Sequence, residues 1–239
     1  MDPRKLFIDQ RLIGTYFYCS APPSTRDHIP SKVFLDLPYP NNLTVVECCS
    51  ECNNSFSLDE EYFACFLECV IQGTAIPNDL FRIKVTKILN RQIKLQNRIA
   101  LSRKINNKNI ITWELEWERI EKIVLKLARG HLSIIHGNNY LGNPISFDIT
   151  TIHNLTDDQL DDFNGIGKSY VDKIPELGSR GCFGINIEKS DNDESNIINT
   201  NYGWNIVQDD LYRYAIDPLS GTWVKIVLRE FLACTVKWL

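Results

Sequence analysis

Hydrophobic and polar positions along the chain change their period several times, and these changes predict the elements. Residues 14–50 are expected to form extended segments and loops, because proline-containing stretches interrupt them. From about Cys52 to Gln72 apolar residues recur at helical spacing, and Gly73 then supplies a stop. The expected order at the start of the chain is therefore strand, strand and helix.

Two further helices are expected in the middle of the chain. One covers roughly residues 79–103, and the other covers roughly residues 114–129 with Gly130 as its stop. The second helix has one apolar face, which consists of Ile120, Ile123, Val124, Leu127 and Ala128. The sequence Thr156-Asp-Asp-Gln159 is a capping box and predicts a short helix that begins there.

The C-terminal part is rich in β-branched and aromatic residues. Strand-like segments cover residues 203–216 and 222–238, and the turn-forming sequence 217–221 separates them. This arrangement predicts an antiparallel β hairpin that belongs to a second, supporting region. The fold class expected for the whole chain is α+β.

Composition places the chain among ordinary globular proteins. The 239 residues are 44% hydrophobic and 23% charged, which is enough to bury a sizeable core. No apolar run reaches the length of a membrane span, and the first residues do not have the pattern of a signal peptide. We therefore expect a cytoplasmic protein with reduced thiols and no membrane partner.

The net charge of −4 hides a basic segment. Residues 81–110 contain nine Lys or Arg and no Asp or Glu. On one helix, five of these residues would form a single stripe, namely Lys84, Lys87, Arg91, Lys94 and Arg98. An apolar stripe of Phe81, Val85, Ile88, Leu95 and Ile99 would lie beside it. The basic stripe is either a solvated face or a surface that contacts nucleic-acid phosphates.

Residues with catalytic and metal-binding chemistry gather between positions 27 and 53. Asp27 and Asn53 offer oxygen donors, which suit Mg²⁺ or Mn²⁺. His28 has a side chain that can accept a proton from water at neutral pH. Cys49 and Cys52 form a Cys-x-x-Cys pair, and such thiolates prefer Zn²⁺.

The order Asp27-His28, Asn42, Cys49-x-x-Cys52 and Asn53 resembles the HNH, or ββα-metal, endonuclease family in the variant where asparagine replaces the last histidine. The likeness covers roughly residues 14–70. It implies an HNH-like ββα-metal module over residues 1–75, followed by a helical and β-hairpin supporting or binding region over 76–239.

The same resemblance implies a role for each matching residue. Asp27 and Asn53 would hold the catalytic Mg²⁺ or Mn²⁺, and His28 would be the general base. Asn42 would brace the loop between strand and helix, with the adjacent Asn41 as the alternative.

The cysteines depart from the family pattern. Where a zinc knuckle usually has its first Cys-x-x-Cys, this chain has only Cys19. A structural Zn²⁺ would be held by Cys19, Cys49 and Cys52, with Cys48 as a possible fourth ligand, or the knuckle would be free of metal. The plain alternative is that these are buried thiols. Cys65 and Cys69 fall on an apolar helical run and are predicted to be core residues.

Two other segments resemble phosphate-binding motifs. The sequence 165–169 ends like a P-loop, but Asp162 stands where the first glycine is required, which argues against nucleotide binding. Residues 160–174 resemble a helix-hairpin-helix motif, although the acidic residues of its first helix would repel phosphate.

The sequence thus predicts a metal-dependent endonuclease that acts on DNA. A partner protein or the rest of the chain would select the target, and likeness of residues 49–62 to small stand-alone bacterial proteins suggests defence against foreign DNA. Two alternatives remain open, namely a catalytically silent zinc-stabilised module that binds nucleic acid or protein, and a ribonuclease that uses the same site.

Overall fold

The computed structural model describes residues 18–19, 21–136, 142–165, 184–187, 198–201, 203–217 and 222–238. It contains helices and antiparallel sheets, so the α+β class is confirmed. The chain divides into two compact units, which are residues 1–130 (unit 1) and 131–239 (unit 2). The segment 1–75 therefore lies inside a larger unit.

Unit 1 begins with the predicted strand, strand and helix. Strands β1 (Thr25–Ile29) and β2 (Thr44–Cys48) pair antiparallel, and helix α1 (Ser50–Gln72) follows directly. The Cys49 side chain accepts a hydrogen bond from the Cys52 backbone N–H at 3.3 Å, which caps the start of α1. The helix ends at Gly73, whose φ of 67° is a left-handed conformation that glycine adopts without strain. The predicted boundaries of this helix are confirmed to within two residues.

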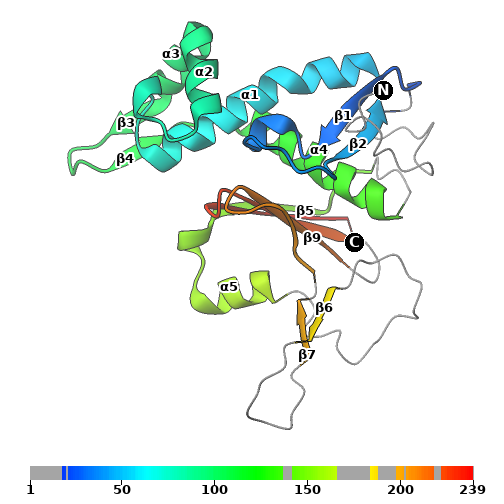
Figure 1. Ribbon diagram of the computed structural model, residues 1–239. Helices are drawn as coiled ribbons and strands as arrows, with labels where there is room; N and C mark the ends of the chain where they lie inside the picture. The colour runs from blue at the N-terminus through cyan, green and yellow to red at the C-terminus, as the bar shows by residue number, and fades with distance from the viewer. Residues whose placement is uncertain are drawn as a thin grey trace. The chain divides into compact units, whose positions relative to one another are not determined.

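The rest of unit 1 is mainly helical. Figure 1 shows the β1–β2 hairpin beside the N-terminal part of α1, with the next helices and a small hairpin at the other end of α1. These elements are the 3-10 turns Lys32–Phe34 and Pro77–Asp79, helices α2 (Ile83–Arg91) and α3 (Ile93–Ser102), strands β3 (Arg103–Ile105) and β4 (Ile111–Trp113), and helix α4 (Trp117–His136).

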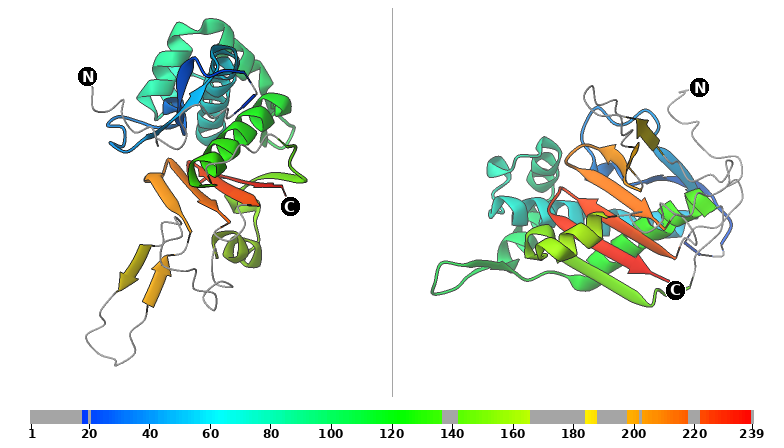
Figure 2. Two further views of the ribbon diagram at one scale, coloured as in Figure 1. Left: turned by 90° about the vertical axis from the view of Figure 1, so that its right-hand side faces the viewer. Right: turned by 90° about the horizontal axis from the view of Figure 1, so that it is seen from below.

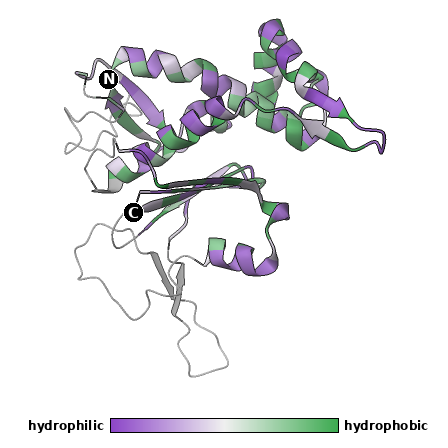
Figure 3. Cartoon of the chain, turned by 180° about the vertical axis from the view of Figure 1, so that it is seen from behind, coloured by the Kyte–Doolittle hydropathy of each residue, from purple (hydrophilic) through white to green (hydrophobic). Residues whose placement is uncertain are grey.

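The single helix predicted over residues 79–103 is wrong. It divides at Gln92, where φ of −108° and ψ of 72° leave the helical region. In Figure 3, hydrophilic and hydrophobic residues are both visible on α2 and α3. Val85, Ile88 and Ile99 of the predicted apolar stripe are buried, whereas Phe81 is 82% exposed. The change of direction at Gln92 prevents the basic positions from forming one continuous helical stripe.

Helix α4 confirms its predicted apolar face but not its predicted end. All five residues of that face are buried. The helix continues through Gly130 to His136. A Cβ atom at Gly130 would lie 2.8 Å from the Ile29 side chain, which is closer than real Cβ contacts allow. Gly130 therefore permits a close approach of α4 to β1 and does not act as a helix stop.

The core of unit 1 lies between α1 and its neighbours. Cys65 and Cys69 are fully buried, and this confirms that they are core residues. The ring of Phe63 meets that of Phe34 edge-on, at a centroid distance of 5.5 Å. None of the helices in the described part of the chain has the length and apolar character needed to span a bilayer.

Unit 2 is built on a five-stranded antiparallel sheet rather than on the single hairpin that the sequence predicts. The strand order is β5-β11-β10-β9-β8, and Figure 2 shows the strands side by side. Strands β6 and β7 pair separately. The strands are β5 (Ser146–Thr151), β6 (Gly184–Ile187), β7 (Ile198–Asn201), β8 (Asn205–Gln208), β9 (Tyr212–Ile216), β10 (Trp223–Leu228) and β11 (Leu232–Lys237).

Each predicted C-terminal segment is itself folded into two strands. A turn at residues 209–211 separates β8 from β9, and a turn at 229–231 separates β10 from β11. Asp210, Arg229 and Glu230 have positive φ in these turns, and none of them is a glycine or proline that would mark a turn in the sequence. The predicted pairing of the two segments is confirmed between β9 and β10, where Ile216 faces Val224.

The short helix α5 (Asp157–Asn164) confirms the predicted capping box. Its Phe163 packs with Val227 and Ala233 of the sheet. A 3-10 turn, Ile152–Asn154, connects β5 to this helix. Most of the P-loop-like and helix-hairpin-helix-like sequences lies outside the described residues.

Candidate metal centre and catalytic site

Three cysteines meet where β2 passes into α1. The sulfur atoms of Cys19, Cys49 and Cys52 all lie within 4.8 Å of one another, and those of Cys19 and Cys49 are 3.5 Å apart. Three thiolates at this spacing supply three of the four ligands of a tetrahedral Zn²⁺ site. The cluster can therefore hold a metal such as zinc, and these are the three residues that the sequence predicted.

Cys49 and Cys52 differ in how readily their thiols lose a proton. Hydrogen bonding from Cys52, chiefly from its backbone N–H, lowers the pKa of the Cys49 thiol, whereas burial and hydrogen bonding to the neighbouring sulfurs raise the pKa of Cys52 to about 12. Without metal, the Cys49 thiol therefore loses its proton more readily than the Cys52 thiol. A bound Zn²⁺ would replace these protons and keep the sulfurs together.

Cys48 has a different environment. Its sulfur lies 3.3 Å from the hydroxyl oxygen of Thr25, and burial raises its pKa to about 11. Cys48 is not among the clustered sulfurs. Adjacent positions on a strand point to opposite faces, and this explains why Cys48 and Cys49 do not converge.

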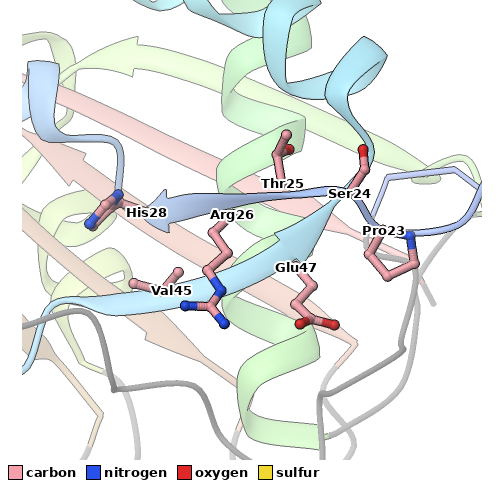
Figure 4. Close-up of a pocket in the computed structure, with 7 residues that line it drawn as sticks. All are labelled: Pro23, Ser24, Thr25, Arg26, His28, Val45 and Glu47. Carbon is pink, nitrogen blue, oxygen red and sulfur yellow. The ribbon is translucent and has the colours of Figure 1, made fainter. Parts of the chain in front are cut away.

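A pocket of about 590 Å³ lies on one face of the β1–β2 hairpin. Figure 4 shows Arg26 and His28 of β1 with Val45 and Glu47 of β2 along it. Burial, reinforced by the nearby charge of Lys32, lowers the pKa of His28. His28 is therefore neutral at pH 7 and can accept a proton. Arg26 supplies a positive charge on the same face, and Glu47 a negative one.

Asp27 lies on the opposite face of β1 from His28. It is 7% exposed, and its Oδ2 atom is 2.5 Å from the Nζ atom of Lys126 in α4. The Tyr18 hydroxyl donates to the same oxygen at 3.4 Å. Lys126 also contacts the carboxylate of Glu60 and the hydroxyl of Ser31. The Asp27 carboxylate is thus part of a buried ion-pair network.

Asn53 and Asn42 occupy separate positions. The Asn53 amide nitrogen donates to the Thr25 hydroxyl at 3.3 Å and to the Arg26 carbonyl at 3.4 Å, and so joins α1 to β1. Asn42 is exposed in the turn that precedes β2. All of β2 separates it from the junction with α1, so this geometry does not support the role of bracing the strand–helix loop, and the adjacent Asn41 is equally exposed there.

The oxygen ligands predicted for Mg²⁺ or Mn²⁺ do not form a suitable site in this arrangement. A divalent ion needs free carboxylate oxygens. Asp27 instead binds the Lys126 ammonium, and the Asn53 amide is oriented by two acceptors on β1. The structure therefore fits a soft metal at the thiols better than a hard ion between Asp27 and Asn53.

Three of the five residues in the predicted basic stripe contact protein groups. Lys84 donates to the carbonyl of Lys32 at 2.6 Å. Arg91 lies 3.6 Å from a Glu61 carboxylate oxygen, and Arg98 pairs with Glu116. Lys87 and Lys94 are exposed on α2 and α3 respectively. Arg91 and Arg98 remain 72% and 59% exposed in their ion pairs, so their charges, like those of Lys87 and Lys94, stay accessible to a phosphate.

Sequence reasoning missed Arg26, Glu60 and Lys126. Lys126 gave one signal, since it lies three residues after Ile123 and so falls near the apolar face of its helix. A lysine at such a position either extends to solvent or finds a buried anion. Its partners, Asp27 and Glu60, are too distant in the sequence for spacing to reveal them.

No family model, curated protein or solved structure matches this chain in the three comparisons. The resemblance to HNH endonucleases therefore depends on the motif residues.

Proposed function

We propose that unit 1 is an endonuclease-like module that hydrolyses phosphodiester bonds, with DNA as the substrate, on the pocket face of the β1–β2 hairpin. The observation that carries this proposal is that a neutral, partly buried His28 and the Arg26 guanidinium line the same pocket. A base and a cation at one place are suited to an attacking water and a phosphate anion.

In this mechanism His28 takes a proton from the attacking water, whose oxygen bonds to phosphorus while the P–O bond to the leaving sugar oxygen breaks, and that oxygen takes up a proton from solvent. Arg26 binds a non-bridging phosphate oxygen, and its charge offsets the charge that develops there. Zn²⁺ at the thiols would hold β2 against α1, and so would support the hairpin. No step passes through an ion on Asp27, since Lys126 engages that carboxylate.

The buried ion pair between Asp27 and Lys126 favours a second candidate function. A module that keeps the zinc cluster and the fold but no longer holds a catalytic ion would bind nucleic acid or protein without turnover. Glu47 on the pocket face also weakens phosphate binding there. Cleavage assays separate the two candidates directly.

The test is nicking of supercoiled plasmid by the zinc-loaded full chain, with and without Mg²⁺, and with a single-stranded RNA in parallel. We expect His28→Ala to lower the cleavage rate by about 10²–10⁴, the usual contribution of a general base. His153→Ala is the matched control, because His153 is exposed and belongs to unit 2.

Equal rates for the wild type and His28→Ala would contradict the proposed mechanism. Binding of DNA without any cleavage would support the silent module. Cleavage of RNA alone would identify a ribonuclease.

A further inference from the structure

Lys126 is a charged residue whose side chain is buried in the interior of unit 1. Its side chain is 0% exposed, against 9% for Asp27 and 11% for Glu60. The ammonium has three N–H donors, and three oxygen acceptors surround it, which are the carboxylates of Asp27 and Glu60 and the hydroxyl of Ser31. All its hydrogen-bonding capacity is thus used inside the protein.

Aromatic rings complete the environment of the ammonium. Its nitrogen lies 5.1 Å from the centroid of Phe56 and 5.9 Å from that of Tyr18. Rings at these distances attract a cation electrostatically. Strand β1, helix α1 and the 3-10 region after β1 all contribute groups that favour positive charge at one point.

The groups around this point are also those that bind a hard metal ion. Two carboxylates and a hydroxyl offer only oxygen, as Mg²⁺ and Mn²⁺ sites do. Two ionised carboxylates against one ammonium leave one net negative charge. Loss of the ammonium would leave two buried carboxylates at this point without their cation.

We infer that Lys126 serves as a built-in cation, which keeps Asp27 and Glu60 closed to divalent metal ions. The protein therefore takes up no Mg²⁺ or Mn²⁺ at Asp27, and removal of the ammonium converts the same oxygen cluster into a divalent-ion site. This inference is independent of the proposed nuclease function, since it concerns ion binding and not cleavage.

The experiment measures Mn²⁺ binding to the zinc-loaded full chain by the electron paramagnetic resonance signal of free Mn²⁺. We expect the wild type and Asp27→Asn to bind the same amount. Lys126→Ala should bind one more Mn²⁺ per chain, and its melting temperature should rise with Mn²⁺ while that of the wild type does not. The added ion should be lost when Asp27→Asn and Glu60→Gln are combined with Lys126→Ala. Lys104→Ala is the control, because Lys104 pairs with Glu114 at an exposed position.

A Mn²⁺ that binds the wild type and is lost in Asp27→Asn would overturn the inference. A folded Lys126→Ala that gains no ion would overturn it as well. If Lys126→Ala does not fold without metal, folding restored by Mn²⁺ supports the inference, and the comparison of the wild type with Asp27→Asn still decides it.

Discussion

The two units differ in what their interiors contain. In unit 1 the buried polar groups include the charged residues Asp27, Glu60 and Lys126. The described interior of unit 2 is formed mainly by apolar sheet residues, and its buried His131 and Tyr212 form a neutral pair with 2.7 Å between the ring nitrogen and the hydroxyl oxygen. Burial lowers the pKa of His131 to about 3, so this histidine is uncharged at pH 7.

The two kinds of interior make different contributions to the protein. Buried ion pairs are costly to desolvate and often add little stability, but they fix which groups meet. Neutral, apolar interiors stabilise a sheet without such a penalty. The network of Asp27, Glu60 and Lys126 lies in the unit with the candidate site, where the position of β1 matters.

The largest expected effect comes from a substitution that breaks the charge network of unit 1. Lys126→Met leaves the Asp27 and Glu60 carboxylates unpaired, so we expect a loss of about 3–5 kcal/mol in the free energy of opening. Native-state hydrogen exchange of α1 amides measures it, while β10 amides report on unit 2. Lys104→Met should cost no more than about 1 kcal/mol, because its ion pair is exposed. Similar costs for the two variants would contradict the importance of the buried network.

Zinc should act on unit 1 alone. If the ion binds folded Cys19, Cys49 and Cys52, free zinc at a thousand times Kd should stabilise α1 by about 4 kcal/mol. Chelation should remove this protection, and Cys52→Ser should abolish the response. Cys234→Ser is the control, since Cys234 is a buried thiol of unit 2. Protein that contains no zinc when purified from zinc-supplemented medium would show that the cluster is held by packing alone.

A change of pH should act on unit 2 through His131. Its folded pKa lies below the unfolded value, so the unfolded state binds the proton more readily, and stability is complete above about pH 6.5 and falls as the pH drops towards the folded pKa. Between pH 7 and pH 5 this amounts to about 2 kcal/mol. Exchange of β10 amides at both pH values measures it, and His131→Gln should show a smaller change. An equally steep loss of stability with pH in His131→Gln would show that another group takes up the proton.

The smallest expected effect concerns the start of α5. Thr156→Ala removes one half of the capping box and should cost about 1 kcal/mol. We expect the loss to appear in exchange of α5 amides and not in those of α1. Thr156→Ser retains the hydroxyl and should restore most of the stability. An effect of equal size on α1 would mean that the two units do not respond separately.

Local patterns predicted local structure well. The helix that ends at Gly73 and the capping box at Thr156 depend on neighbouring residues, and both are confirmed. The break at Gln92 has no proline or glycine to mark it, so periodicity alone carried the prediction through it. The turns at Asp210 and Arg229 were missed for a similar reason.

The candidate site was only partly predictable for a different reason. The three cysteines were predictable because Cys49 and Cys52 are close in the sequence at the start of α1, and the motif indicates Cys19 as the third. The ion pair of Asp27 with Lys126 joins residues 99 positions apart, and no short-range pattern encodes such a contact.

Gly130 shows how a missing side chain can act at a distance along the chain. Where α4 approaches β1, the backbone of Gly130 packs directly against the Ile29 side chain. The methyl group of Gly130→Ala would clash with the Ile29 side chain, although alanine favours helices more than glycine does. The strand would tilt or shift at the residue next to His28. The position of β1, and with it that of His28, therefore depends on a residue without a side chain that packs on the other face of the strand.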